Sequence, residues 1–425
     1  MLKTLAAILL GKSIFTLSRI LKLGGGYAAP GLYALKIEPD LVSKLINHKS
    51  KNIIVTGTNG KTTTSKLISH FLKSSENRVL KNSSGSNLER GIASYLVSHA
   101  NLAGKLDYDF GVWELDEFAF NSVALKIEPD VIILLNAFRD QLDRYGEVDT
   151  VVQKWKTTLS KLSEKTVLII NQDDALLHKA LADFKGKIVN IGLKNSQITG
   201  EGKSKSTKKP DYQAEILNDS TLETTNVKVE FNGSTLEYKL PLPGAFNTYN
   251  FLAAFTLAHL LNIDPEFIGN TLQHFKSSFG RFEKFQINGK EANIFLIKNP
   301  VGATQVLKTI LPYMSSKDSL LIALNDNFAD GTDVSWIWDI ELEKFQIPNS
   351  KFQILTSGTR AHDMALRLKY ADIEAPDSEP DILKAFNKAA AHTENKLFIL
   401  PTYTALIQLQ KILVAKGIKK EYWKE

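Results

Sequence analysis

Cysteine is absent from this 425-residue chain. The absence excludes disulfide bonds, a thiol nucleophile and any zinc or iron–sulfur centre held by cysteine, so zinc is not expected. It also fits a reducing compartment, and we therefore expect a cytoplasmic protein. The eight histidines show neither H-x-x-x-H nor H-E-x-x-H spacing, so the sequence gives no sign of a histidine metal site.

Long apolar runs are missing too. No segment reaches the roughly 18–20 consecutive apolar residues that cross a bilayer. The segment Leu2–Leu23 has the pattern of an amphipathic helix and carries Lys3, Lys12, Arg19 and Lys22. Such a helix packs on the protein body or rests on a membrane surface. We expect packing, and peripheral attachment at the inner face of the cell membrane is the alternative.

Acidic residues are in the minority, since 52 Lys and Arg stand against 46 Asp and Glu, a formal net charge of +6. This balance favours anionic partners such as nucleotides, nucleic acid or an anionic membrane, unless the excess is scattered over the surface. One basic run, Lys203–Lys209, is predicted to be a loop. It has no interleaved aromatic side chains on which bases could stack, so no nucleic-acid partner is expected.

Strand and helix patterns alternate along the chain from about residue 50. This order predicts an α/β fold in which helices cover both faces of a parallel sheet. After residue 191 a polar loop at 194–210 precedes a predicted hairpin that turns at Asn232-Gly233. A second strand–helix series begins at 281. The candidate strands are 52–55, 78–81, 110–114, 130–135 and 166–170 in the first series, and 293–297, 320–324, 352–355 and 397–400 in the second.

The length predicts two or three domains. We expect an N-terminal helical and irregular segment at 1–45 that packs on the next domain. A central domain at 46–280 would contain the main parallel sheet, with the polar loop and hairpin inserted at about 194–240. A smaller, Rossmann-like α/β domain would occupy 281–425.

A phosphate-binding loop is predicted at Val55–Thr64, where VTGTNGKTTT joins a strand to a helix. Glycines allow the backbone a tight turn close to an anion, and the helix start offers free N–H groups. Lys61 is expected to reach the β- and γ-phosphates of ATP, and a Thr hydroxyl to bind magnesium. The nucleotide-binding residues predicted here are Gly57, Thr58, Asn59, Gly60, Lys61, Thr62 and Thr63.

This loop departs from the general pattern G-x-x-x-x-G-K-[ST]. Val55 stands at the first glycine position, and a glycine stands at 57 instead. The alternative interpretation is a glycine turn that only caps a structural helix. The position between a strand and a helix favours the phosphate site.

Residues 56–64 resemble the ATP loop of the Mur ligase superfamily, which includes the peptidoglycan stem-peptide ligases and folylpolyglutamate synthetase. Similar motifs follow in the same order: WELDE around Glu114, PGAFNTYN at Pro243–Asn250 and GRFE at Gly280–Glu283. The resemblance implies a Mur ligase-type central ATPase domain.

The motifs also imply roles for particular side chains. Thr62 and Glu114 would hold magnesium. Asn247, Asn250 and Arg281 would contact the nucleotide.

Two longer signatures resemble the MurT branch of this superfamily. They are NAFRDQLDRYGE at Asn136–Glu147 and LNDNFADGTDVSWIWD at Leu324–Asp339, and the stretch Gly24–Gly31 is similar as well. The resemblance implies a synthetase subunit that pairs with a GatD-type glutaminase. The pair would amidate the α-carboxylate of D-glutamate in the lipid II stem peptide to D-isoglutamine, with ATP and with ammonia from glutamine.

The MurT resemblance fails at one point. MurT proteins commonly carry a four-cysteine zinc ribbon in the middle domain, and this chain has no cysteine. Its polar loop and hairpin occupy that region instead.

The resemblance further implies that an aspartate of the last domain completes the Cys–His pair of the glutaminase. Asp330, Asp333 and Asp339 are the candidates, and we select Asp333 as the catalytic one. A carboxylate there would orient the partner's histidine. The alternative is that these aspartates cap the start of a helix.

A charged cluster and one lysine each allow two interpretations. Arg139, Asp140, Asp143 and Arg144 either line a site at a strand end, which we favour, or form a salt-bridged turn. Lys156 either corresponds to the carbamylated lysine of several Mur ligases or is a surface lysine on an amphipathic helix, and we assign it no role.

Other functions share the predicted nucleotide site. An amino-acid-adding Mur or folylpolyglutamate-type ligase would join an amino acid rather than ammonia. A nucleotide-binding switch would bind ATP without any ligase chemistry. The nucleophile that is consumed, ammonia or an amino acid, distinguishes the amidating ligase from the amino-acid-adding one. ATP turnover that depends on lipid II excludes the switch.

Overall fold

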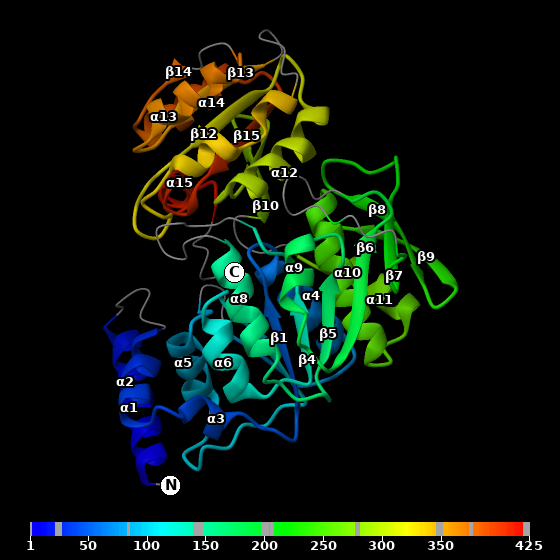
Figure 1. Cartoon of the computed structure of the whole chain (residues 1–425). Coiled ribbons are helices and arrows are strands. Elements are labelled where there is room, and N and C mark those ends of the chain that lie inside the picture. Colours follow the sequence, from blue (N-terminus) through cyan, green and yellow to red (C-terminus); the bar gives the residue numbers. More distant parts are fainter. Residues whose placement is uncertain are drawn as a thin grey trace.

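The computed structural model describes residues 2–21, 28–82, 86–138, 148–196, 204, 208–276, 281–345, 352–373 and 377–419. It contains two α/β units, each built around its own sheet (Figure 1). Within the described ranges, no helix is both long enough and apolar enough to cross a membrane. Gly280 and the charged cluster Arg139, Asp140, Asp143 and Arg144 lie outside these ranges.

The first unit is built on a nine-stranded sheet in the order β2-β3-β1-β4-β5-β6-β7-β8-β9. Neighbours from β2 to β7 are parallel, and β8 and β9 add an antiparallel hairpin at one edge. Its central strands are apolar runs because both faces of a parallel sheet are covered. The strands are β1 (Lys51–Thr56), β2 (Val79–Lys81), β3 (Phe110–Glu114), β4 (Val131–Leu134), β5 (Val167–Asn171), β6 (Lys187–Leu193), β7 (Tyr212–Ile216), β8 (Thr225–Phe231) and β9 (Ser234–Leu240).

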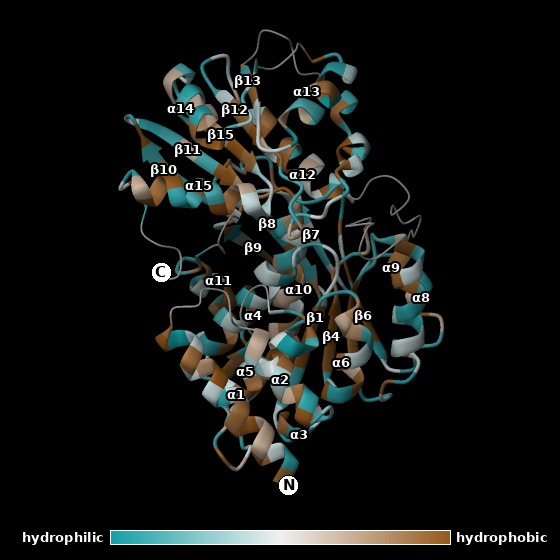
Figure 2. Cartoon of the chain, turned by 90° about the vertical axis from the view of Figure 1, so that its left-hand side faces the viewer, coloured by the Kyte–Doolittle hydropathy of each residue, from teal (hydrophilic) through white to brown (hydrophobic). Residues whose placement is uncertain are grey.

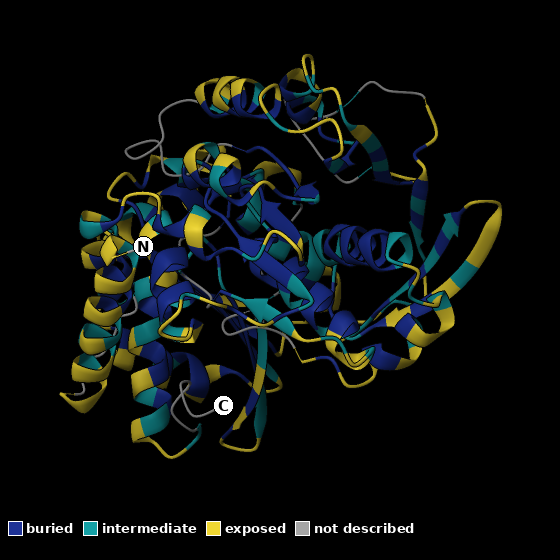
Figure 3. Ribbon diagram, turned by 90° about the horizontal axis from the view of Figure 1, so that it is seen from below, coloured by how far each residue is buried: buried dark blue, intermediate teal, exposed yellow. Residues whose placement is uncertain are grey.

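Helices form a layer on each face of this sheet, and each layer closes its own apolar core. Figure 3 shows the buried strands between helices whose outer surfaces are exposed. One layer consists of α4 (Lys61–Ser74), α10 (Ala245–Leu260) and α11 (Pro265–Leu272). The other consists of α3 (Leu41–Leu45), α5 (Glu89–His99), α6 (Ala119–Ile127), α8 (Val148–Leu159) and α9 (Ala175–Ala180).

Two N-terminal helices, α1 (Leu2–Ile20) and α2 (Ala29–Ile37), lie outside α5 at the edge of the molecule (Figure 1). The contact depends on a glycine that allows close approach. A Cβ on Gly31 would lie 2.0 Å from the carbonyl oxygen of Arg90 in α5. The N-terminal segment therefore packs on the central unit at van der Waals distance.

The second unit is built on a six-stranded sheet in the order β10-β11-β15-β12-β13-β14. Only the β10–β11 pair is antiparallel. The strands are β10 (Arg281–Ile287), β11 (Lys290–Phe295), β12 (Ser319–Ala323), β13 (Gln353–Ser357), β14 (Asp377–Ser378) and β15 (Lys396–Pro401). One face carries α12 (Pro300–Ile310), α13 (Ala361–Tyr370) and the 3-10 helices η3 (Leu311–Tyr313), η4 (Ser335–Asp339) and η5 (Leu342–Lys344), and the other carries α14 (Ile382–His392) and α15 (Tyr403–Ala415).

The α/β class and the alternation predicted from the sequence are confirmed, with two differences. The sequence patterns did not reveal the helix α6 or the strands β6, β10 and β14. The hairpin predicted to turn at Asn232-Gly233 is confirmed as β8 and β9, but together with β7 it continues the central sheet rather than forming a separate insertion. These strands gain their place because β7 pairs with β6, a partner that local sequence does not reveal, and β8 and β9 follow in turn. The domain bounds at 46 and 281 stay a prediction.

Candidate functional site

The loop between β1 and α4 takes a conformation that only glycine adopts without strain. Gly57 has φ of +137° and Gly60 has φ of +90°. A Cβ on Gly57 would lie 3.0 Å from the backbone nitrogen of Asn136. A Cβ on Gly60 would lie 2.1 Å from Oδ1 of Asn250. Both glycines are therefore required, and the loop leaves the first N–H groups of α4 facing the space in front of it.

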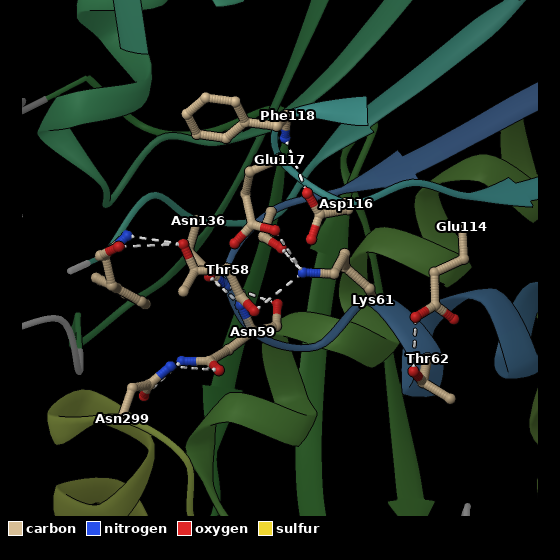
Figure 4. Close-up of polar contacts among 12 residues, drawn as sticks. Thr58, Asn59, Lys61, Thr62, Glu114, Asp116, Glu117, Phe118, Asn136 and Asn299 are labelled. Carbon is tan, nitrogen blue, oxygen red and sulfur yellow. Dashed lines mark hydrogen bonds and ion pairs between the residues drawn. The ribbon is translucent and has the colours of Figure 1, made fainter. Parts of the chain in front are cut away.

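The ammonium group of Lys61 is buried at the start of α4 (Figure 4). Its Nζ donates to the carbonyl oxygens of Gly57 and Thr58, the latter at 3.2 Å, and lies 3.0 Å from Oε2 of Glu117. A buried ammonium group is stable only when it is paired, and Glu117 provides the opposite charge. Sequence reasoning gave Glu117 no role, although it belongs to the WELDE stretch.

Thr62 and Glu114 lie side by side next to this lysine. Thr62 Oγ1 donates to Glu114 Oε1 at 2.8 Å, and Ser65 Oγ donates to Oε2 at 3.4 Å. Glu114 is held at the end of β3 by Asn82, whose amide accepts from the Glu114 N–H at 2.8 Å and donates to its carbonyl at 3.0 Å. A hydroxyl and a carboxylate are the oxygen ligands that magnesium prefers, so the pair fits that ion.

A larger metal cage is not present in the described ranges. They contain no group of three or more His, Asp or Glu side chains arranged to hold an ion. Magnesium with few protein ligands usually keeps several waters and substrate phosphates in its coordination sphere.

Asn136, the first residue of the NAFRDQ signature, supports the phosphate loop directly. Its Oδ1 accepts from the Asn59 N–H at 2.8 Å, and its Nδ2 donates to the Asn59 carbonyl at 3.0 Å. Its own carbonyl accepts from the Thr58 N–H at 3.0 Å. The signature was noted in the sequence, but this function of its asparagine was not.

Asp174 holds the backbone next to Asn136, at Ala137. Its carboxylate accepts from the Ala137 N–H at 2.7 Å and from the Leu176 N–H at 3.0 Å, and it caps the start of α9. Burial raises the pKa of the Asp174 carboxyl to about 7, against the lowering effect of the N–H groups that it accepts from. The sequence gave no signal for this residue, since its partner Ala137 lies on another strand end.

Two predicted asparagines reach the loop from the start of α10. Thr64 Oγ1 donates to Asn250 Oδ1 at 3.3 Å, and Asn250 Nδ2 donates to Asn247 Oδ1 at 3.3 Å. They form one wall of a cleft between the central and C-terminal units. The cleft is lined by Asn59, Gly60, Pro243, Gly244, Phe246, Asn247, Asn250, Phe282, Phe295, Leu296, Lys298, Gly302, Gln305, Val306 and Thr309.

The opposite wall includes a residue in an unusual conformation. Phe282 has φ of +62° at a β-bulge between Arg281 and Glu283, and its ring lies 5.4 Å from that of Phe295. Such strain in a non-glycine residue often marks a functional site. Arg281 starts β10 beside it, but its side chain lies outside the described part.

The three candidate aspartates of the C-terminal unit differ in accessibility. Asp330 is buried and accepts hydrogen bonds from the backbone N–H and the hydroxyl of Thr404. Asp333 and Asp339 are exposed. Asp333 Oδ1 accepts from the Ser335 N–H at 2.8 Å at the start of η4. Hydrogen bonds from the backbone and the side chain of Ser335 lower the pKa of the Asp333 carboxyl.

Lys156 forms an ion pair with Asp183 at 3.3 Å, and both side chains are partly or largely exposed. This arrangement is that of a surface lysine.

The fold matches that of a known class of enzymes. The Mur ligase middle domain family matches residues 55–258, and the MurT ligase C-terminal family matches residues 296–406. The structure of MurF from Acinetobacter baumannii superposes with a TM-score of 0.70 at 18% identity, covering 90% of this chain and 79% of that one. MurF from Thermotoga maritima, solved in complex with ADP, gives a TM-score of 0.68 at 13% identity, covering 89% and 83%. The chain has the fold of the Mur ligases.

One relative identifies the family within this class. The protein named lipid II isoglutaminyl synthase (glutamine-hydrolyzing) subunit MurT, from Streptococcus pneumoniae, is 32% identical, covering 99% of this chain and 99% of that protein. The chain belongs to the MurT family. The resemblance drawn from the two long signatures is confirmed.

Proposed function

We propose that this protein is the synthetase subunit of a lipid II isoglutaminyl synthase. It would use ATP to amidate the α-carboxylate of D-glutamate in the lipid II stem peptide to D-isoglutamine. The observation that carries the proposal is the match along 99% of both chains to a relative with that name. The geometry around Lys61, Thr62 and Glu114 supports the ATP-dependent part.

The chemistry requires activation of a carboxylate. A carboxylate oxygen attacks the γ-phosphorus of ATP, the bond to ADP breaks, and an acyl phosphate forms. Ammonia then attacks the carbonyl carbon, inorganic phosphate leaves, and the nitrogen loses a proton. The protein must align these groups and exclude water, because water would hydrolyse the acyl phosphate.

The residues of the site have distinct tasks in this scheme. Lys61 and the first N–H groups of α4 would neutralise and orient the terminal phosphates. The contacts that Lys61 makes with Glu117 and two loop carbonyls keep its ammonium group at the loop. Thr62 and Glu114 would hold magnesium, which lowers the charge of the phosphates when bound. Asn247, Asn250 and Arg281 are proposed to contact the nucleotide.

The ammonia is proposed to come from a GatD-type glutaminase bound to the C-terminal unit. The relative's name calls it a subunit of a glutamine-hydrolyzing enzyme, which supports such a partner. Asp333 is exposed, and its carboxylate accepts from Ser335 at the start of η4. It is our candidate for orienting a histidine in the partner's active site.

The substrate places the protein at the cytoplasmic side of the cell membrane in this proposal. We also assign the N-terminal segment to residues 1–45, the central ATPase domain to 46–280 and the C-terminal domain to 281–425. The cleft then lies at the junction of the last two.

Isotope labelling tests the function. The purified chain is incubated with ATP, lipid II and either ¹⁵N-ammonium alone or ¹⁵N-amide glutamine plus the glutaminase. The label should appear in a carboxamide on the D-glutamate α-carbon, as shown by fragmentation mass spectrometry. Addition of an amino acid to the peptide would instead favour the amino-acid-adding ligase. Absence of ATP turnover with lipid II would contradict both.

A further inference from the structure

The outer surface of α1 and α2 is apolar and exposed. Leu2, Leu9, Leu17 and Ile20 are 84%, 46%, 56% and 71% exposed. Their spacing of seven, eight and three residues puts them on one face of the helix. Figure 2 shows hydrophobic residues along this helix. We call this surface the N-terminal apolar face; it comprises Leu2, Leu5, Leu9, Leu10, Leu17, Ile20, Leu21, Leu32 and Tyr33.

The concentration is unusual for the surface of a soluble domain. These nine side chains are almost half of the nineteen large apolar side chains that are exposed in the described ranges. By contrast, α1 buries only Ala7, Ile8 and Gly11 against the protein. The helix therefore buries one isoleucine and two small residues and turns its leucines outward, the reverse of a helix that serves only the core. A contiguous exposed apolar surface of this kind indicates an interaction site.

The charged residues of the N-terminal segment 1–37 have one sign. Residues 1–37 contain Lys3, Lys12, Arg19, Lys22 and Lys36 and no acidic residue. The first acidic side chain, Glu38, is paired with Lys44 at 2.6 Å.

Two of these cations flank the apolar face. Leu2 and Ile20 are 18 residues apart, which is five full helical turns, so they share one line along α1. Lys3 follows Leu2 and Arg19 precedes Ile20, so these cations lie on opposite sides of that line. Both are exposed, as is Lys36 on α2.

We propose that the N-terminal apolar face docks on an anionic lipid bilayer. The leucines would enter the boundary between headgroups and acyl chains, and Lys3, Arg19 and Lys36 would contact lipid phosphates. The inference deepens the proposed function, since a lipid-linked substrate is reached at a bilayer. The docking itself requires no ligase chemistry.

Charge favours the bilayer over a second copy of the chain. A two-fold dimer through this face would set two identical surfaces against each other, each with several cations and no acidic residue. Like charges in such an interface repel. An anionic membrane complements the apolar residues and the cations at once.

Co-sedimentation of the full chain with vesicles tests the proposal. The vesicles contain equal amounts of phosphatidylglycerol and phosphatidylcholine, or phosphatidylcholine alone. The wild-type protein should bind the mixed vesicles, and the triple variant L9N/L17N/I20N should bind at least about tenfold more weakly, because three inserted side chains are lost. The matched control L102N/L366N/L383N removes three leucines that are exposed elsewhere, by 58%, 47% and 45%, and should bind as the wild type does.

A charge variant separates the two contributions. K3Q/R19Q/K36Q should lose most of the preference for phosphatidylglycerol over phosphatidylcholine, and added salt should weaken wild-type binding in the same way. Equal preference in this variant and the wild type would contradict the assigned role of the cations.

Three results would overturn the proposal. They are failure of the wild type to bind mixed vesicles, equal binding by L9N/L17N/I20N, and a wild-type dimer in light scattering that this variant converts to a monomer. Amidation of a water-soluble stem-peptide substrate by L9N/L17N/I20N is measured in parallel. If the wild type also fails to amidate, the proposed function is at fault, and the vesicle result alone decides the docking.

Discussion

Asn59 in the phosphate loop and Asn299 in the C-terminal unit form a reciprocal amide pair (Figure 4). Asn59 Nδ2 donates to Asn299 Oδ1 at 3.2 Å, and Asn299 Nδ2 donates to Asn59 Oδ1 at 3.0 Å. Asn299 is buried and also caps α12 by accepting from the Gly302 N–H at 2.8 Å. The pair thus links the start of α12 to the loop proposed to bind phosphates.

Substitution of the two asparagines should show that they act together. Asn59→Ala keeps the α12 cap and should raise the KM for ATP about three- to tenfold, as expected for one or two lost hydrogen bonds. Asn299→Ala should do the same and also lower the stability by about 1 kcal/mol through loss of the cap. The double variant should have little further effect on KM, because each single change already breaks the pair. Fully additive effects on KM would show that the pair does not couple the units.

Lys61→Ala should abolish ATP binding and also destabilise the fold. Calorimetry with a non-hydrolysable ATP analogue should show at least a roughly hundredfold loss of affinity. The melting temperature should fall as well, because Glu117 is left buried without its cation, a change that typically costs about 3–5 kcal/mol. Lys61→Ala combined with Glu117→Gln should recover much of the stability and none of the affinity. Unchanged ATP affinity in Lys61→Ala would show that the nucleotide does not bind at this loop.

Gly60→Ala should be far more damaging than the same change at another glycine with positive φ. Gly233, in the β8–β9 turn, has φ of +78°, and a Cβ there meets nothing within 4 Å. Gly233→Ala should therefore cost only the backbone strain of roughly 1–2 kcal/mol. At Gly60 the added Cβ also collides with Asn250, so Gly60→Ala should lose ATP binding. Comparable melting temperatures and ATP affinities in the two variants would mean that the loop can rearrange.

Asp174 should make the stability depend on pH. Its pKa is raised from 3.8 unfolded to about 7 folded, so the folded state binds more protons between these values. Stability from this group is complete below pH 4 and is lost as the pH rises to 7, by roughly 4 kcal/mol in total. Asp174→Asn removes the titration but accepts only one of the two N–H groups. The variant should melt below the wild type at pH 5, and the gap should narrow by pH 8. A gap independent of pH would contradict the raised pKa.

Asp333→Asn should separate the two activities of the proposed complex. Glutamine-driven amidation should fall at least about a hundredfold, because an amide does not stabilise a histidinium ion. Amidation with free ammonia should stay at the wild-type rate. Asp339→Asn is the matched exposed control and should keep both activities. Asp330→Asn should chiefly lower the melting temperature, because Asp330 holds Thr404. Intact glutamine use by Asp333→Asn would reject the assignment.

Sequence reasoning succeeded where the information is local. The alternation of strands and helices predicted the α/β class, and the long signatures identified the MurT family. It also brought Gly60, Lys61 and Thr62 together, because they are contiguous. Strands such as β6 and β7 were missed or misplaced, since their pairing depends on neighbours distant in the chain.

By itself, the sequence determined the glycine-containing loop at 57–60 and its place between a strand and a helix, because glycine conformation and helix start are properties of adjacent residues. The tertiary structure alone decided what surrounds the loop. Glu117 reaches Lys61 from 56 positions away, and Asn299 reaches Asn59 from 240 positions away. It also decided that the leucines of α1 face outward. Such contacts arise only when the sheets and their helices pack, and no local pattern encodes them.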